Sequence, residues 1–132
     1  MENLKVGLKS IKEEVVTEVK TAKSYGSGGV DVYATPAMIG LMEGAALSAV
    51  DPLLPEGMAT VGIHLDVAHL AATPVGMKVR AEAEVIAIEG KKITFHIHAY
   101  DDVEKIGEGR HQRFIISLDK FMAKNAAKGE KA

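Results

Sequence analysis

The chain has 132 residues, of which 47% are apolar, and it contains no cysteine. This length and apolar content predict one folded domain with one core. The absence of thiols excludes cysteine nucleophiles, disulfides and thiolate metal sites. The net charge is −2, and interspersed acids and bases offer no basic face to nucleic acid. Because no apolar run approaches the ~20 residues that cross a bilayer and the charged first residues are unlike a signal peptide, we expect a cytoplasmic protein.

The first part of the chain is predicted to form a strand and a turn. Residues 8–22 mix apolar and charged side chains, and their valines favour a strand. The sequence Gly-Ser-Gly-Gly at 26–29 then predicts a flexible turn. A phosphate-binding loop is the alternative at this position, but the pattern G-x-x-x-x-G-K is absent.

The stretch from Pro36 to Val50 is a predicted helix with a single ionisable residue, Glu43. It reads PAMIGLMEGAALSAV, and apolar residues occupy nearly every direction around it, a pattern typical of a helix buried on all sides. The helix is expected to stop near Asp51. A lone carboxylate in such surroundings is costly unless a partner pairs with it, hydrogen-bonds it or uses it. A neighbouring arginine or bound waters would explain Glu43 structurally, and catalysis is the other interpretation.

The rest of the chain is predicted to be β-structure. Apolar and polar residues alternate with the period of two that is typical of half-buried strands. The predicted strands cover residues 61–68, 77–85, 93–100 and 106–118. Turn sequences separate them at 73–76, 89–91 and 101–102.

This order of elements predicts an α+β fold. Consecutive hairpins form an antiparallel sheet, and a strongly curved sheet wrapped around the long helix would cover it, which is the hotdog arrangement. We expect a single hotdog domain over residues 1–132, with a core at about 8–118 and a polar, dispensable C-terminal tail at 120–132. Because a single sheet leaves its edges open, we expect pairing with a second copy, as a dimer or a tetramer.

Three polar residues lie where these predicted elements begin or end, or inside the helix. Thr35 precedes Pro36 at the start of the helix, Glu43 lies within it, and His69 ends the next strand. Hydroxyl, carboxylate and imidazole groups are the parts from which acyl-transfer sites are built. The structural alternatives are a helix N-cap for Thr35 and a satisfied structural role for His69. Eight residues span about 12 Å of helix, so we prefer a site at a subunit interface to direct contact between Thr35 and Glu43.

Three stretches of the sequence resemble the fluoroacetyl-CoA thioesterase family. They are Tyr33-Ala34-Thr35-Pro36 with Leu41 and Glu43, then Thr60-Val61-Gly62 and His69 with Thr73-Pro74 and Gly76, and finally Gly109, His111 and Arg113. Together these stretches cover roughly residues 15–118. The resemblance implies a hotdog fold, a dimer or larger assembly, and hydrolysis of acyl-CoA thioesters to free acid and CoA.

The resemblance also implies roles for individual residues. The catalytic Thr, Glu and His of the family correspond to Thr35, Glu43 and His69, and its CoA-contacting positions correspond to Gly62 and Arg113. Glu43 would act as the base for a water or as the nucleophile, and the sequence leaves both open. His69 would move the proton, and Thr35 would bind the thioester or orient the attacking group. No cofactor is required.

Five histidines raise the question of a metal site. His96 and His98 point to one face of a predicted strand, but no spacing supplies a third ligand with a supporting carboxylate. We therefore predict no metal site and place both residues on the polar face of the sheet. His111 and Arg113 also share a strand face, where an ordinary ion pair and a contact to a CoA phosphate are both open.

One segment departs from the family. The fluoroacetate-specific member carries aromatic residues just before the position of Tyr33, where this chain has Gly26, Ser27, Gly28 and Gly29. We therefore expect the gate that selects a small acyl group to be missing, and the substrate to be a small or medium acyl-CoA. The alternative function is a non-catalytic hotdog that binds acyl-CoA as a ligand sensor or carrier.

Overall fold

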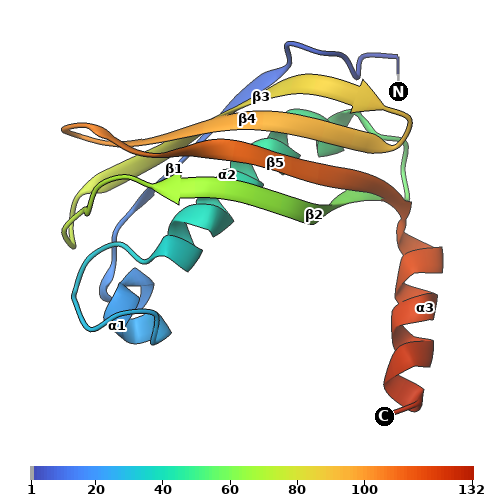
Figure 1. Ribbon diagram of the computed structural model, residues 1–132. Coiled ribbons are helices and arrows are strands. Elements are labelled where there is room, and N and C mark those ends of the chain that lie inside the picture. The colour runs from blue at the N-terminus through green and yellow to red at the C-terminus, as the bar shows by residue number, and fades with distance from the viewer. Residues whose placement is uncertain (1) are drawn as a thin grey trace.

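The computed structural model describes residues 2–132, which form a curved antiparallel sheet of five strands packed on one long helix (Figure 1). The strands are β1 (Lys9–Val15), β2 (Met58–His69), β3 (Lys78–Glu89), β4 (Lys92–Asp101) and β5 (Lys105–Ser117). The helices are α1 (Ala22–Tyr25), α2 (Thr35–Val50) and α3 (Leu118–Glu130), with 3-10 turns at Glu18–Lys20 and Asp51–Leu53. The predicted α+β fold is confirmed.

The core lies between α2 and the concave face of the sheet. Met38, Met42 and the alanines of α2 are buried against the inward-facing residues of β3 and β4. Those inward residues are Val79, Ala81, Ala83, Val85, Ile93, Phe95, Ile97 and Ala99. Complete burial of an aromatic side chain such as Phe95 contributes about 2–3 kcal/mol. Gly107 permits the close approach of helix and sheet, because a Cβ at this position would lie 2.6 Å from Met38 Sδ.

One side of α2 is not covered, so the prediction of a helix buried on all sides is wrong. Pro36, Gly40 and Leu47 are exposed, and the side chain of Glu43 is 36% exposed. These four positions follow one another at helical spacing and form a single stripe. The reason is geometric: a five-stranded sheet curves over only part of the helix, and α2 is apolar beyond the part that the sheet covers.

The strand order is β1-β3-β4-β5-β2, so the predicted run of consecutive hairpins is wrong at one connection. β3, β4 and β5 follow one another as hairpins, but the chain between His69 and Lys78 crosses the sheet from β2 to β3, which lies between β1 and β4. This crossing is anchored along the way. Thr73 accepts a backbone hydrogen bond from Tyr33 (2.8 Å), and its hydroxyl donates to Asp101 Oδ2 (2.9 Å). The crossing leaves β2 at the edge, beside β5 alone.

The predicted strand at 8–22 is shorter in the structure. β1 ends at Val15, and the chain then forms a 3-10 turn and α1. Thr21 caps α1, because its side chain accepts a hydrogen bond from the Ser24 amide (3.2 Å). Gly26 ends α1 with φ at 71°, a left-handed conformation that favours glycine. Local capping therefore outweighs the valine content that favoured a strand.

The predicted C-terminal tail forms helix α3, which extends away from the sheet (Figure 1). None of its residues is buried. Across residues 2–132, the structure contains no helix with both the length and the apolar character needed to span a membrane.

Candidate active site

The start of α2 meets the end of β2 through a hydrogen bond between two predicted site residues. Thr35 Oγ1 lies 2.7 Å from His69 Nδ1. Ala34 occupies the N-cap position, and Thr35 is already the first helical residue. A capping side chain requires the non-helical backbone of the residue before the helix. The capping alternative for Thr35 is therefore wrong, and its hydroxyl bonds to His69 instead.

The environment of His69 keeps its imidazole neutral near pH 7. Burial lowers the pKa of His69, and the backbone of Ala71 offsets part of this effect. With the proton on Nε2, Nδ1 accepts the hydrogen bond from the Thr35 hydroxyl. His69 Nε2 is buried and has no hydrogen-bond partner among the residues that the structure describes. Since buried polar atoms are normally paired, this nitrogen is a natural contact for a substrate or a solvent molecule.

A hollow of about 370 Å³ adjoins the Thr35–His69 pair. Most of its other lining residues are small or aliphatic. They are Ala22, Ser27, Val32, Tyr33, Leu70, Ala71 and Ala72. Tyr33 is the one bulky aromatic ring among them, and its hydroxyl is already engaged, because it donates to Glu14 Oε2 at 2.5 Å. Burial, followed by this contact, raises the pKa of Tyr33 far above its usual range, so the ring serves as a neutral wall.

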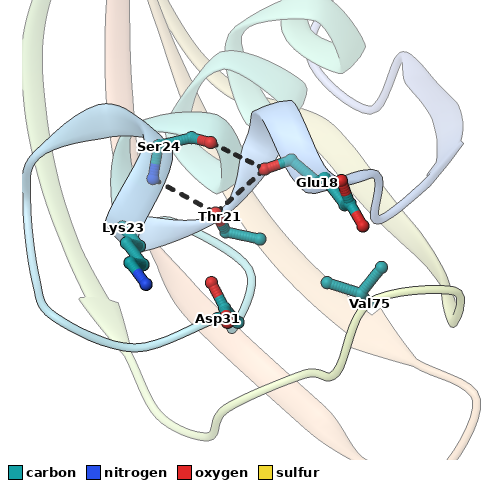
Figure 2. A pocket seen from close by; sticks show the side chains of 6 residues that line it. All are labelled: Glu18, Thr21, Lys23, Ser24, Asp31 and Val75. Atoms are coloured by element: carbon teal, nitrogen blue, oxygen red, sulfur yellow. Dashed lines mark hydrogen bonds between the residues drawn. The ribbon is translucent and has the colours of Figure 1, made fainter.

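A second and larger hollow, of about 640 Å³, lies beside α1 (Figure 2). It is lined by Glu18, Thr21, Lys23, Ser24, Asp31 and Val75. The hydroxyls of Thr21 and Ser24 both donate to the Glu18 carbonyl, each at 2.9 Å. These groups therefore hold the turn together, and none of the three predicted catalytic residues lines this hollow.

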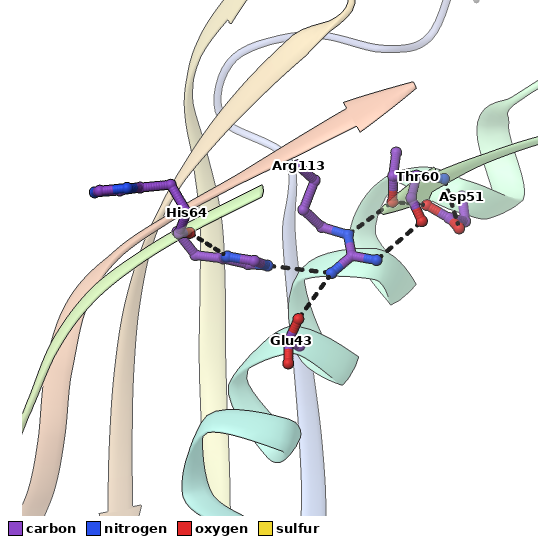
Figure 3. A network of polar contacts seen from close by, with 6 residues as sticks. Glu43, Asp51, Thr60, His64 and Arg113 are labelled. Atoms are coloured by element: carbon purple, nitrogen blue, oxygen red, sulfur yellow. Dashed lines mark hydrogen bonds and ion pairs between the residues drawn. The ribbon is translucent and has the colours of Figure 1, made fainter. Parts of the chain in front are cut away.

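Glu43 lies beside a buried arginine that comes from β5 (Figure 3). Arg113 Nη1 is 3.6 Å from Glu43 Oε2, and the Arg113 side chain is only 7% exposed. Its other two nitrogens are held by Thr60: Nε donates to Oγ1 at 2.7 Å, and Nη2 donates to the carbonyl at 3.0 Å. The structural explanation considered for Glu43, a neighbouring arginine, is therefore present. Glu43 has both a counter-ion and access to solvent.

His111 supports the same guanidinium group. Its Nδ1 lies 2.8 Å from the His64 carbonyl oxygen, and its Nε2 lies 3.1 Å from Arg113 Nη1. A carbonyl only accepts and a guanidinium only donates, so the imidazole is neutral and carries its proton on Nδ1. Burial lowers the pKa of His111, with Arg113 contributing in the same direction. Protonating His111 would remove the acceptor that Arg113 uses.

The network continues to the end of α2. Thr60 Oγ1 donates to Asp51 Oδ1 at 2.6 Å, and the Thr60 amide lies 3.3 Å from Asp51 Oδ2. Asp51 and Glu43 therefore flank the buried Arg113 with negative charge. Neither Asp51 nor Thr60 was among the site residues predicted from the sequence. The one relevant feature of the sequence was that His111 and Arg113 share a strand face. Nothing in the sequence indicated that this face would contact β2 and α2.

Gly62 allows the Glu43 carboxylate to approach the backbone of β2. A Cβ at residue 62 would lie 2.6 Å from Glu43 Oε2 and 3.1 Å from His111 Cε1. The pairing of β2 with β5 also shifts register between Gly62 and His64, and such bulges are common beside functional sites. The local backbone is therefore adapted to Glu43.

The predicted site residues thus form two groups in one chain. Thr35 and His69 make the first group, and Glu43, Gly62 and Arg113 make the second. The groups lie eight residues apart along α2, about 12 Å, and seven residues apart along β2, about 23 Å. Neither the helix nor the strand brings the two groups together by itself.

A curved sheet wrapped on an apolar helix, with a hydroxyl–imidazole pair where the helix begins, defines a protein of the hotdog class. Residues 16–119 match the family model for the fluoroacetyl-CoA-specific thioesterase, and the chain belongs to this family. The resemblance seen in the sequence is therefore confirmed.

Individual relatives agree with this assignment. The fluoroacetyl-CoA thioesterase of Streptantibioticus cattleyicolor is 43% identical over 94 residues, which are 71% of this chain and 68% of that protein. The crystal structure of a variant of the fluoroacetyl-CoA-specific thioesterase FlK superposes with a TM-score of 0.90 at 36% identity, covering 97% of this chain and 99% of the other. A hypothetical protein of Thermus thermophilus, a thioesterase superfamily member, superposes with a TM-score of 0.91 at 32% identity, covering 99% and 97%.

Proposed function

We propose that this protein hydrolyses a small or medium acyl-CoA to the free acid and CoA. Membership of a thioesterase family supports the thioester hydrolase activity. The observation that carries the assignment to this site is the 2.7 Å hydrogen bond between Thr35 and His69 beside a hollow lined by small residues. We retain a cytoplasmic location as a prediction.

The reaction needs an attacking oxygen, a base and donors for the oxyanion. Either water or the Glu43 carboxylate attacks the thioester carbonyl, the C–S bond breaks, and the CoA sulfur takes up a proton as it leaves. Glu43 serves either as the base that removes the proton of the water or as a nucleophile whose anhydride is then hydrolysed. His69, neutral at pH 7, accepts and returns a proton. Free amides in the first turn of α2 stabilise negative charge near Thr35.

Arg113 acts in this scheme by positioning Glu43. Its three nitrogens all have partners within the chain, so little of the guanidinium group is left for a phosphate. This favours the structural alternative for Arg113 over the predicted contact with CoA, which stays a prediction. Gly62 contributes by giving the carboxylate space against β2, and its amide is a candidate oxyanion donor.

The active unit that we propose is a homodimer, alone or within a tetramer, joined through β2. This strand is an edge of the sheet, and it exposes Ile63 (50%) and Leu65 (36%). An open edge with apolar side chains is a template for pairing with another strand. A two-fold axis makes two copies of β2 antiparallel, and Glu43 of the exposed stripe on α2 lies against this strand at Gly62.

Such pairing explains how the two groups of site residues become one site. If the axis passes between Leu65 and Asp66, Gly62 of one chain lies opposite His69 of the other. Glu43 approaches Gly62 within its own chain, so it would face the partner's Thr35 and His69. Thr35 and Glu43 of one chain are too far apart to act together, but in this dimer they need not do so.

The test is turnover of a panel of acyl-CoA thioesters, measured by release of free thiol. The proposed function requires thiol release in proportion to enzyme. The alternative, a ligand sensor or carrier, requires saturable binding of acyl-CoA without thiol release, and that result would overturn the enzymatic assignment.

A further inference from the structure

The outer face of the sheet carries a cluster of two imidazoles and a carboxylate, on the side away from α2. His96 and His98 alternate with the buried core residues of β4. Glu108 of β5 is the direct register partner of His98. The sequence could not reveal this cluster, because Glu108 is twelve residues from His96 and becomes its neighbour only when β4 and β5 pair.

The three side chains converge on one point. His96 Nε2 lies 3.1 Å from Glu108 Oε2, and His98 Nδ1 lies 3.8 Å from Glu108 Oε1. One ligand atom from each residue falls within 4.8 Å of the other two. Bond lengths of about 2.0–2.1 Å in a tetrahedral zinc site place ligand atoms about 3.4 Å apart, so small side-chain rotations close the remaining gap.

We propose that His96, His98 and Glu108 bind Zn²⁺, with water in the fourth position. Two imidazoles with one carboxylate form a known ligand set for zinc, and imidazole favours zinc and its transition-metal neighbours over Mg²⁺ or Ca²⁺. The predicted absence of a metal site rested on a missing third ligand, and Glu108 supplies it.

Three features of the cluster favour the binding of a cation. His98 Nδ1 is buried and has no hydrogen-bond partner within the described part of the chain. A hollow of about 140 Å³ adjoins both imidazoles, and Glu82 and Glu84 also line it. Lys105 at present occupies one position, since its ammonium group donates to Glu108 Oε1. Zn²⁺ would displace this ammonium group, so Lys105 is a built-in competitor.

The site joins β4 to β5 on the face opposite the helix and the proposed catalytic residues. Bound Zn²⁺ would therefore stabilise the fold, because a ligand that binds only the folded state raises its stability. It takes no part in thioester hydrolysis, and the inference is independent of the proposed function.

The experiment uses the full-length, tag-free protein after treatment with a chelator. Co²⁺ is titrated while its visible absorption is followed, and Zn²⁺ is titrated by calorimetry. We expect one ion per chain. His98→Ala and Glu108→Gln should each weaken binding by at least about tenfold, because each removes a ligand. Lys105→Gln should tighten binding several-fold, because it removes the competing charge.

A matched control separates this site from general histidine binding. His64→Ala removes an exposed imidazole on β2, which β5 separates from β4, and should leave Zn²⁺ affinity unchanged. Zn²⁺ should also raise the melting temperature of the wild type and of His64→Ala, but not of His98→Ala. Failure to saturate below about 1 mM Zn²⁺, or equal weakening by His64→Ala and His98→Ala, would overturn the proposal.

Discussion

The two ends of the proposed site differ in how fully their polar groups are partnered. At the start of α2, Thr35 is exposed, and His69 makes one side-chain hydrogen bond and leaves Nε2 without a partner in the described chain. In the middle of α2, Glu43 lies beside Arg113, whose three nitrogens all have partners. Groups that exchange protons need free positions, whereas groups that place a charge need rigid ones. We infer that the imidazole of the first region moves a proton, whereas the second region holds the Glu43 carboxylate in a fixed position for its role as base or nucleophile.

The largest effect is expected from Glu43→Gln, which keeps the shape of the side chain but removes its charge. Thioester hydrolysis should fall by about 10⁴-fold, while circular dichroism shows an intact fold. Glu56→Gln, at an exposed loop position, is the matched control and should retain full activity. A folded Glu43→Gln variant with near-normal turnover would remove Glu43 from the mechanism.

His69→Gln is expected to lower kcat by about 10³-fold, since the amide cannot accept a proton. The pH profile gives a second measurement. Burial lowers the pKa of His69, so its neutral form persists below the usual value near 6.5. Wild-type activity should therefore fall only as the pH drops through this lowered pKa. A residual rate in His69→Gln that shows the same acid limb would contradict the role of His69.

Arg113→Lys should act mainly on stability, because a lysine cannot reproduce the forked contacts of a guanidinium. We expect unfolding in urea to show a loss of about 3 kcal/mol, the usual cost of disrupting a buried pair, together with reduced kcat and little change in KM. Arg110→Lys on the exposed face of the same strand is the control and should change stability by less than about 0.5 kcal/mol. If Arg113→Lys raises KM alone, Arg113 contacts CoA directly.

The smallest effect concerns the acyl group. The hollow beside Thr35 and His69 is lined by small residues, and Gly26–Gly29 supply no aromatic gate. A pocket that selects by size gains about 1–3 kcal/mol per methylene, so kcat/KM for fluoroacetyl-CoA and acetyl-CoA should agree within about tenfold. Comparison with propionyl- and medium-chain acyl-CoA completes the series. A preference for fluoroacetyl-CoA by several orders of magnitude would show that another part of the molecule forms a gate.

The sequence predicted those features that depend on local periodicity. Alternation correctly predicted the inward faces of β3 and β4, and Glu89-Gly90-Lys91 correctly predicted the hairpin between them. The sequence did not predict the crossing from β2 to β3 over the other strands, because its anchor is a hydrogen bond between Thr73 and Asp101, which are distant in sequence. The partners of Arg113 could not be predicted from a local pattern either, because they are also distant from it in sequence.

The exposed stripe on α2 shows a second limit of prediction from sequence. Apolar content indicates how much of a helix is destined for burial, but not which chain provides the cover. Leu47 remains 37% exposed in the isolated chain, and in our account a second copy lies over this side. The sequence-based expectation of burial would then apply to the dimer, whereas the structure describes a single chain.

Subunit complementation tests the central claim most directly, namely that one site combines Thr35 and His69 of one chain with Glu43 of the other. The double variant Thr35→Ala/His69→Gln and the single variant Glu43→Gln are each inactive in this account. Unfolded together in equal amounts and refolded, they should form mixed dimers that contain one intact site, and recover about one quarter of wild-type activity. Mixed dimers that form, as shown by affinity tags on the two variants, yet remain inactive would contradict the account.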